Sequence, residues 1–271
     1  MTDRYAVMGN PVAHSKSPFI HAMFAHQNEQ DLSYDAILVP LDGFKRAVGE
    51  FFANGGKGLN ITVPFKQEAW ELAKVRSPGA ELAGAVNTLL MNSKGELEGH
   101  NTDGPGLMQD LTVNAGGVIE NKRVLVIGAG GATRGIMLPF LKQKPAEVVI
   151  VNRTVSKAEE LAELFRTYGN VRACGFDALP GQQFDWVVNA SSASLEGALP
   201  PLPEDLLAPD AWCYDLMYAK EPTIFCRWAL EHGAHRAIDG LGMLIEQAAE
   251  AFLLWRGVRP ETSAVLQALR G

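Results

Sequence analysis

Residues 123–135 read RVLVIGAGGATRG, and this stretch decides the fold of the chain. The first five residues form a short apolar run rich in β-branched side chains, which predicts a buried strand of a parallel sheet. Gly128, Gly130 and Gly131 follow directly, and helical periodicity begins behind them. A glycine turn between a strand and a helix brings free backbone N–H groups close to a phosphate. The stretch therefore indicates a dinucleotide-binding α/β domain. Thr133 departs from the usual fingerprint G-x-G-x-x-G/A, and a tight turn that binds no ligand is the alternative.

A second apolar run, EVVIV at residues 147–151, predicts which dinucleotide is bound. An NAD site needs Asp or Glu after this strand, to accept hydrogen bonds from the ribose 2′-hydroxyl. The chain has Asn152, Arg153 and Thr154 there, with Lys157 one helical turn further on. No carboxylate would repel a 2′-phosphate, and a guanidinium can form a forked pair with one. The pattern favours NADP, and a solvated loop arginine is the alternative for Arg153.

Composition excludes several classes of protein. The 271 residues are enough for two domains, and 47% hydrophobic and 20% charged residues are typical of a globular protein. A net charge of −7 argues against a nucleic-acid partner. Cys174, Cys213 and Cys226 are odd in number and lack metal-ligand spacing, which indicates reduced thiols and no metal. With no signal core or membrane-length apolar run, we expect a cytoplasmic protein with no membrane partner.

Hydroxyl groups gather near the N-terminus, in the stretch HSKSP at residues 14–18. Ser17 could cap a helix over residues 19–27, with Pro18 at its first position. That interpretation leaves Ser15 without a role, so an oxyanion-binding turn is an equal alternative.

The stretch GLNITVPFK at residues 58–66 predicts a strand with a polar face. Alternation places Asn60 and Thr62 on one face of that strand. Lys66 near the strand end could be a solvated lysine or a general acid–base group. Asp103, in the stretch HNTDGPG, could be a turn or helix-capping residue or a functional carboxylate.

Periodicity predicts the other elements. Expected strands cover residues 5–8, 34–38, 89–91, 171–175, 185–189 and 212–215, and expected helices cover residues 41–54, 68–74, 155–168, 223–232 and 243–255. Residues 97–103 follow an expected turn at residues 93–95. The proline-rich residues 200–209 are expected to form a loop. The alternation of strands and helices after residue 123 predicts a doubly wound sheet.

Eight motifs in fixed order resemble one known family, the shikimate dehydrogenases. They are GNPVAHSKSP, NITVPFK, GAVNT, HNTDGPG, GAGGATR, NRT, DLMY and GLGMLIEQAAEAF, and together they span nearly the whole chain. The pattern is most similar to the NADP-dependent, shikimate-specific branch of that family.

The resemblance implies an α/β fold of two domains. Residues 1–103 would form the α/β substrate domain, residues 104–237 the Rossmann NADP-binding domain, and residues 238–271 the helices that return to the first domain. The implied activity is the reversible reduction of the ketone of 3-dehydroshikimate to shikimate with NADPH, a step of aromatic amino-acid biosynthesis.

The resemblance also implies the site residues. Lys66 and Asp103 would be the catalytic pair. Ser15 and Ser17 would hold the substrate carboxylate. The other substrate contacts would be Asn60, Thr62, Asn87, Tyr218 and Gln247. The cofactor contacts would be Gly128, Ala129, Gly130, Gly131, Ala132, Asn152, Arg153, Thr154, Lys157, Leu216 and Gly240.

Two departures from the family pattern and three rivals are left open. Lys157 stands where an arginine is common, and the family often has threonine and glycine where Ser191, Ser192 and Ser194 stand. The rivals are a quinate/shikimate dehydrogenase that prefers NAD, a catalytically silent NADP-binding regulator, and a related amino-acid or methylene-folate dehydrogenase. The oligomeric state is open, with a homodimer as one alternative.

Overall fold

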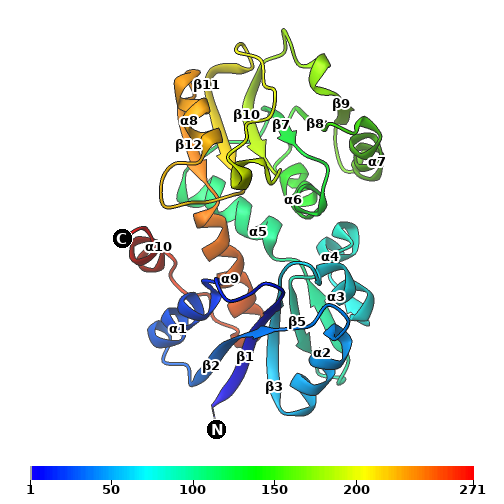
Figure 1. Cartoon of the computed structure of the whole chain (residues 1–271), viewed down its shortest axis with the longest axis vertical. Helices are drawn as coiled ribbons and strands as arrows, with labels where there is room; N and C mark the ends of the chain where they lie inside the picture. The colour runs from blue at the N-terminus through cyan, green and yellow to red at the C-terminus, as the bar shows by residue number, and fades with distance from the viewer. Residues whose placement is uncertain (1) are drawn as a thin grey trace. The chain divides into compact units, whose positions relative to one another are not determined.

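Two six-stranded sheets organise the chain in the computed structural model, which describes residues 2–271 apart from the side chains of Leu195 and Glu196. Each sheet belongs to one of two compact units (Figure 1). Unit 1 comprises residues up to Gly106 together with Leu244–Gly271, and unit 2 comprises Leu107–Met243.

Unit 2 contains the sheet predicted around the glycine turn. Its strands are β7 (Arg123–Ile127), β8 (Glu147–Val151), β9 (Val171–Cys174), β10 (Phe184–Asn189), β11 (Leu207–Asp215) and β12 (Arg236–Asp239). Every neighbouring pair is parallel, in the order β12-β11-β10-β7-β8-β9. Read from β9, this is the dinucleotide-binding order 3-2-1-4-5-6, in which ligands bind where the order reverses. Here the reversal lies between β7 and β10, at the glycine turn.

Helices cover this sheet (Figure 1). They are α6 (Gly131–Lys142), α7 (Val155–Phe165) and α8 (Ile224–Glu231), with short 3₁₀ turns at η2 (Phe176–Ala178) and η3 (Ala193–Glu196). Helix α7 packs against β8 and β9, and α8 packs against β11 and β12. The apolar side chains of β7, β8 and β10 are fully buried, which is the reason their sequences are continuous hydrophobic runs.

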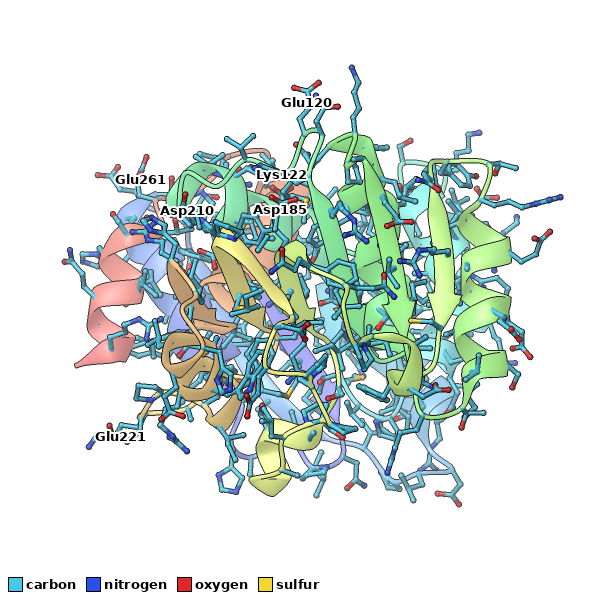
Figure 2. The ribbon with its side chains drawn as sticks, turned by 90° about the horizontal axis from the view of Figure 1, so that it is seen from above. Glu120, Lys122, Asp185, Asp210, Glu221 and Glu261 are labelled. Atoms are coloured by element: carbon cyan, nitrogen blue, oxygen red, sulfur yellow. The ribbon has the colours of Figure 1, made fainter. Side chains whose placement is uncertain are left out.

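The end of β7 remote from the glycine turn is fixed by polar contacts. Asp185 accepts a hydrogen bond from the Arg123 backbone N–H (2.8 Å) and lies 3.3 Å from Lys122 Nζ. Figure 2 shows Lys122 and Asp185 beside each other, with Glu120 projecting away from them. These contacts hold β7 and β10 in register, so that the two strands reach the ligand-binding edge together.

Unit 1 has a mixed sheet. Its strands are β1 (Asp3–Gly9), β2 (Leu32–Leu38), β3 (Gly56–Ile61), β4 (Val75–Arg76), β5 (Thr88–Met91) and β6 (Leu97–His100), in the order β2-β1-β3-β5-β6-β4. Strand β1 is parallel to β2 and β3, whereas β5 is antiparallel to β3 and β6. The helices of the unit are α1 (Ser17–Gln27), α2 (Phe44–Ala53), α3 (Lys66–Leu72), α4 (Pro78–Ala83) and α10 (Ser263–Arg270).

Two helices carry the chain from one unit to the other. Helix α5 (Asp103–Met108) continues into the π-helix η1 (Gln109–Asn114), and α9 (Leu241–Arg256) brings the chain back. Within unit 1, the indole N–H of Trp255 donates to the Leu89 carbonyl (3.2 Å), and a Cβ on Gly58 would lie 2.4 Å from that indole nitrogen. The expected return of the C-terminal helices to the first domain is therefore confirmed.

Some expected elements were wrong in extent. Strand β11 begins at Leu207, inside the stretch expected to be a loop, and it contains Pro209. A strand can include a proline where a bulge interrupts the hydrogen bonds between strands. The pairing of β10 with β11 shifts register there, and Asp210 has a φ of 60°. The short elements β4, α4 and β12 had no expected counterpart.

Candidate active site

The geometry of unit 1 centres on an ion pair between residues 37 positions apart. Lys66 is the first residue of α3 and Asp103 the first residue of α5. The Lys66 Nζ atom lies 2.6 Å from Asp103 Oδ2, and the two side chains are 32% and 16% exposed. A reacting group can therefore reach both while most of the carboxylate is shielded from water.

Asn87 holds the other oxygen of this carboxylate. Its Nδ2 donates to Asp103 Oδ1 (2.9 Å), while its Oδ1 accepts from the Thr102 backbone N–H (2.9 Å). Asn87 is 2% exposed and immediately precedes β5. Because both Asp103 oxygens have donors, the carboxylate is fixed in direction as well as position.

The turn before α5 is closed by a different residue from Asp103. The Asp103 backbone N–H donates to Asn101 Oδ1 (3.1 Å), and Asn101 Nδ2 donates to the Ala85 carbonyl (3.2 Å). Asn101 therefore forms the local side-chain turn, which leaves the Asp103 carboxylate for Lys66 and Asn87.

Asn60 points into the protein rather than along an open polar face. Its Oδ1 accepts from the Tyr34 hydroxyl (2.7 Å), and its Nδ2 donates to the Asn87 carbonyl (3.2 Å) and to Thr88 Oγ1 (3.1 Å). Strand β3 ends at Ile61, and Thr62 follows it, half-buried, with its backbone N–H still donating to the Met8 carbonyl of β1 (3.0 Å). One lone pair of Asn60 Oδ1 is left for a ligand hydroxyl.

The two serines near the N-terminus lie in one turn. The Ser15 hydroxyl oxygen accepts from the Ser17 backbone N–H (3.2 Å), and Ser17 is 8% exposed. Ser17 is the first residue of α1 and Lys16 precedes the helix, with no side-chain capping bond. The interpretation of Ser17 as the helix cap was therefore wrong, because the backbone N–H of Ser17 is itself a donor to be satisfied.

Gln247 reaches the same cluster from α9. Its Oε1 lies 3.4 Å from Asn87 Nδ2, and its Nε2 donates to the Leu244 carbonyl (2.8 Å). A Cβ on Gly106 would lie 2.5 Å from the Gln247 backbone nitrogen. Glycine at 106 thus permits α9 to approach closely enough for Gln247 to join the site.

In unit 2, the glycine turn joins β7 to α6. Gly128 has a φ of +104° and its N–H donates to the Val151 carbonyl (2.8 Å). Gly130 precedes α6 with no side-chain cap, and a Cβ added to Gly130 or Gly131 would meet no atom within 4 Å. Thr133 is fully buried and donates to the Gly128 carbonyl (2.8 Å), which explains a threonine at the last place of the fingerprint.

The open turn has the character of an anion site. The first N–H groups of α6 have no capping side chain, and Ala129 and Ala132 beside the glycines have no polar side chain to fill it. Since the protein itself does not require glycine at 130 and 131, the free space suits close approach of a pyrophosphate.

The turn after β8 has the expected exposed cations. Arg153, Thr154 and Lys157 are exposed, and Asn152 Nδ2 donates to the Thr154 carbonyl (2.8 Å). Arg153 forms no ion pair with any carboxylate in the described part of the chain. Its guanidinium is therefore available to an anionic ligand.

A buried carboxylate that the sequence analysis missed orders the loops after β10 and β11. Asp215 is fully buried and accepts from Ser194 Oγ (2.6 Å), Thr223 Oγ1 (2.7 Å) and Asn189 Nδ2 (3.1 Å). Burial raises the pKa of Asp215, and these donors oppose that increase. The Ser194 hydroxyl, which had no predicted role, is therefore a hydrogen-bond donor to Asp215.

Leu216 and Gly240, which directly follow β11 and β12, lie close together. A Cβ on Gly240 would lie 2.2 Å from the Leu216 carbonyl oxygen, and the Gly240 N–H donates to the Met217 carbonyl (3.0 Å). Tyr218 follows at 37% exposure, and burial raises the pKa of its phenol. The close approach of two backbone segments requires glycine at 240.

Other candidate groups give no second site. His14 is exposed, and His100 lies 2.9 Å from Glu98. Within residues 2–271 no cluster of three or more His, Cys, Asp or Glu side chains could hold a metal ion. Across the same residues no helix is both long and apolar enough to cross a membrane.

Family comparisons cover most of the chain. Residues 7–89 match the family described as "Shikimate dehydrogenase substrate binding domain", residues 110–196 match "Shikimate / quinate 5-dehydrogenase", and residues 240–270 match "Shikimate 5'-dehydrogenase C-terminal domain". Over 270 residues the chain is 62% identical to the shikimate dehydrogenase (NADP(+)) of Alkalilimnicola ehrlichii, covering 100% of this chain and 99% of that relative.

Solved structures are similar to this chain over nearly its whole length. An Ael1 enzyme from Pseudomonas putida is similar with a TM-score of 0.94 and 50% identity, over 99% of this chain and 98% of that one. A shikimate 5-dehydrogenase from Thermus thermophilus, in complex with NADP(H) and shikimate, is similar with a TM-score of 0.88 and 36% identity, over 99% of each chain.

Proposed function

The chain belongs to the shikimate dehydrogenase family, and from that premise we propose the reaction and the role of each site residue. The protein is an NADP-dependent oxidoreductase that acts on a CH–OH group. It interconverts 3-dehydroshikimate and shikimate reversibly, a step of aromatic amino-acid biosynthesis. The observation that carries the chemistry is the Lys66–Asp103 pair, 2.6 Å apart and oriented by Asn87.

Substrate binding is assigned to unit 1 and, for one residue, to unit 2. Ser15 and Ser17 would donate to the substrate carboxylate from the turn before α1. Asn60 and Thr62 would contact ring hydroxyls, as would Asn87, Gln247 and, from unit 2, Tyr218. Asn60 has only its remaining Oδ1 lone pair to offer, so it would accept a hydrogen bond from a substrate hydroxyl.

Lys66 and Asp103 would handle the proton. In the direction of reduction, the Lys66 ammonium donates a proton to the carbonyl oxygen as that oxygen gains negative charge. Asp103 would accept a hydrogen bond from the hydroxyl group that this proton transfer forms. Its ion pair with Lys66 keeps the ammonium within reach of the reacting oxygen. In the direction of oxidation, neutral Lys66 takes the hydroxyl proton, and the ion pair is restored when the amine becomes charged.

The residues of unit 2 fit NADP. The cofactor, when bound, supplies the hydride that reduction adds to carbon. The uncapped start of α6 and the space at Gly130 and Gly131 suit its pyrophosphate. Arg153, with Lys157 and Thr154, would hold the 2′-phosphate, and no carboxylate follows β8 to repel it.

The test of this assignment replaces the lysine. In Lys66→Met, kcat should fall by about 10²–10⁴-fold, because general acid–base catalysis contributes about that factor. The KM for shikimate should change little, because Ser15, Ser17 and Asn87 remain. Lys74→Met is the matched control, since Lys74 is 71% exposed and pairs with Glu96.

An unchanged kcat in Lys66→Met would contradict the assignment. A loss of the same size in Lys74→Met would show a general effect of removing a lysine instead.

Location and partners are further proposals. Cys174, Cys213 and Cys226 are free and buried, which supports a reducing, cytoplasmic compartment. The absence of a nucleic-acid partner and the homodimer stay predictions.

A further inference from the structure

The hydroxyl group of Thr88 lies in the middle of a continuous series of hydrogen bonds within unit 1. Thr88 is fully buried at the start of β5 and has no role in the reaction described above. Its Oγ1 accepts from Asn60 Nδ2 (3.1 Å) and donates to Asn87 Oδ1 (2.9 Å). Thr88 therefore links Asn60, which is proposed to contact a ring hydroxyl, to Asn87, which holds the Asp103 carboxylate.

The series continues from Thr88 to the catalytic pair. Asn87 Nδ2 donates to Asp103 Oδ1 (2.9 Å), and Asp103 Oδ2 accepts from Lys66 Nζ (2.6 Å). An amide has chemically different ends, so a donor bound to Asn87 Oδ1 determines that the Nδ2 end faces Asp103. Thr88 Oγ1 and the Thr102 backbone N–H supply such donors at 2.9 Å each, and the Thr102 hydroxyl supplies a longer one at 3.2 Å.

The series extends past Asn60 to the half-buried phenol of Tyr34, whose hydroxyl also interacts with the Ser17 side chain. The Tyr34 hydroxyl donates to Asn60 Oδ1 (2.7 Å), and its ring stacks on His21 with centroids 4.2 Å apart and planes at 5°. His21 is 1% exposed on α1, one helical turn after Ser17. With Tyr34 as a donor to Oδ1, the Nδ2 end of Asn60 must face Thr88.

We propose that Thr88 is a positioning residue for the Lys66–Asp103 pair, acting through the Asn87 amide. Without its hydroxyl, Asn87 Oδ1 loses one of the donors that fix its orientation. The alternative orientation of the amide would present Oδ1 to the Asp103 carboxylate, and two acceptors at that distance repel each other. Asp103 and Lys66 would then spend less time in the geometry that proton transfer needs. This inference rests on the proposed roles of Lys66 and Asp103.

The test compares two substitutions at one position. Thr88→Val keeps the β-branched shape but removes the hydroxyl, so kcat for shikimate oxidation should fall about tenfold, in line with the loss of one buried hydrogen bond. The KM for NADP should stay at its wild-type value. Thr88→Ser restores the hydroxyl and should restore kcat to within about threefold of the wild type, as expected if the hydrogen bond is kept.

A double-mutant cycle separates positioning from general destabilisation. In an Asp103→Asn background, Thr88→Val should cause no further loss of kcat, because the group through which it acts is already changed. A full tenfold loss in that background would overturn the proposal. So would a Thr88→Val enzyme with wild-type kinetic constants, whereas a wild-type protein inactive on shikimate would instead overturn the proposed function.

The other end of the series gives a second variant that keeps the test open if Thr88→Val does not fold. Tyr34→Phe removes the donor to Asn60 but keeps the ring on His21, so kcat should fall by a smaller factor, about threefold for a more remote hydrogen bond. Tyr5→Phe is the matched control, because the Tyr5 hydroxyl accepts from Arg256 (3.3 Å) outside the series. Equal kinetic constants in the two variants would overturn the proposal.

Discussion

Asn87 is a buried residue whose proposed role depends on the direction of its hydrogen bonds. Its amide oxygen accepts from Thr102 and Thr88, and its amide nitrogen donates to Asp103. Each contact depends on which end of the amide faces which neighbour, so these contacts together set the orientation of Asn87. The Asp103 carboxylate is oriented in turn by its hydrogen bond with Asn87.

Arg153 is the residue on which the predicted preference for NADP over NAD most depends. In Arg153→Gln, the KM for NADP should rise about 10–100-fold, since a hydrogen bond between charged groups contributes about 1.5–3 kcal/mol. The KM for NAD should hardly change, because NAD has no 2′-phosphate. Initial rates with each cofactor at saturating shikimate measure the difference, with Arg166→Gln as a control at the exposed end of α7. Equal rises for the two cofactors would mean that Arg153 does not contact the phosphate.

At the residue scale, the sequence identified polar residues of the candidate site within motifs better than polar residues within strands. Lys66 and Asp103 stand in recognisable motifs, and the structure brings them to 2.6 Å. The hydrogen-bonding roles of Thr88 and Tyr34 were missed. Thr88 is the first residue of β5 and Tyr34 lies within β2, and threonine and tyrosine are favoured in strands for their shape. The motif GAVNT contains Thr88, which was the one available signal.

At the scale of elements, the glycine turn between β7 and α6 separates two reasons for glycine. Gly128 has a left-handed φ of +104°, which strains any other residue. Gly130 has a φ of −94° and empty space around a Cβ, so the fold does not need glycine there.

This difference predicts opposite phenotypes. Gly128→Ala should lower the free energy of unfolding by about 1–2 kcal/mol, the cost of a left-handed residue that is not glycine. Gly130→Ala should leave the free energy of unfolding unchanged within about 0.5 kcal/mol but raise the KM for NADP, because the methyl group occupies space assigned to the pyrophosphate. Urea denaturation and cofactor kinetics on both variants measure the two effects. A destabilised Gly130→Ala with a normal KM would contradict the assignment.

The predicted elements were most accurate where one pattern dominates. Strands β7, β8 and β10 are continuous apolar runs, and their extents match within one residue. Strand β4 has two residues and is set by pairing with β6, a tertiary contact with no local pattern. The start of β11 was missed because proline normally marks a loop, whereas here it lies beside a bulge.

At the scale of the whole molecule, the two ends of the chain share one unit. His21 on α1 packs near Phe252 and Trp255 of α9, with ring centroids 6.2 Å and 5.4 Å away. The sequence predicted this return only through the family resemblance, because periodicity carries no information on which sheet a terminal helix covers.

His21 gives this unit a pH-dependent stability. Burial lowers the pKa of His21 to about 3, an effect that the nearby Asn60 opposes in part, and its Nε2 has no hydrogen-bond partner. The folded pKa lies below that of the unfolded chain, so the unfolded state takes up the proton first as the pH falls. The stabilisation is fully present above about pH 6.5, the usual histidine pKa, and is lost as the pH falls toward 3.

The free energy of unfolding of the wild type should therefore fall by up to about 2 kcal/mol between pH 6.5 and pH 5 on account of this group. His21→Phe, which keeps a flat ring against Tyr34, should remove that part of the slope. Urea denaturation at several pH values measures it, with His26→Gln as a control at an exposed position of the same helix. An unchanged slope in His21→Phe would mean that His21 is not the titrating group.

The most direct test uses the whole chain, because the proposed catalytic pair lies in unit 1 and the proposed cofactor residues lie in unit 2. Initial rates of cofactor reduction should be measured with shikimate and with quinate, each against NADP and NAD. We expect turnover of shikimate with NADP, and kcat/KM about 10–100-fold lower with NAD, the factor expected from the lost phosphate contacts. Equal or faster turnover with NAD or with quinate would contradict the assignment of an NADP-dependent, shikimate-specific enzyme and identify the NAD-preferring quinate/shikimate branch instead.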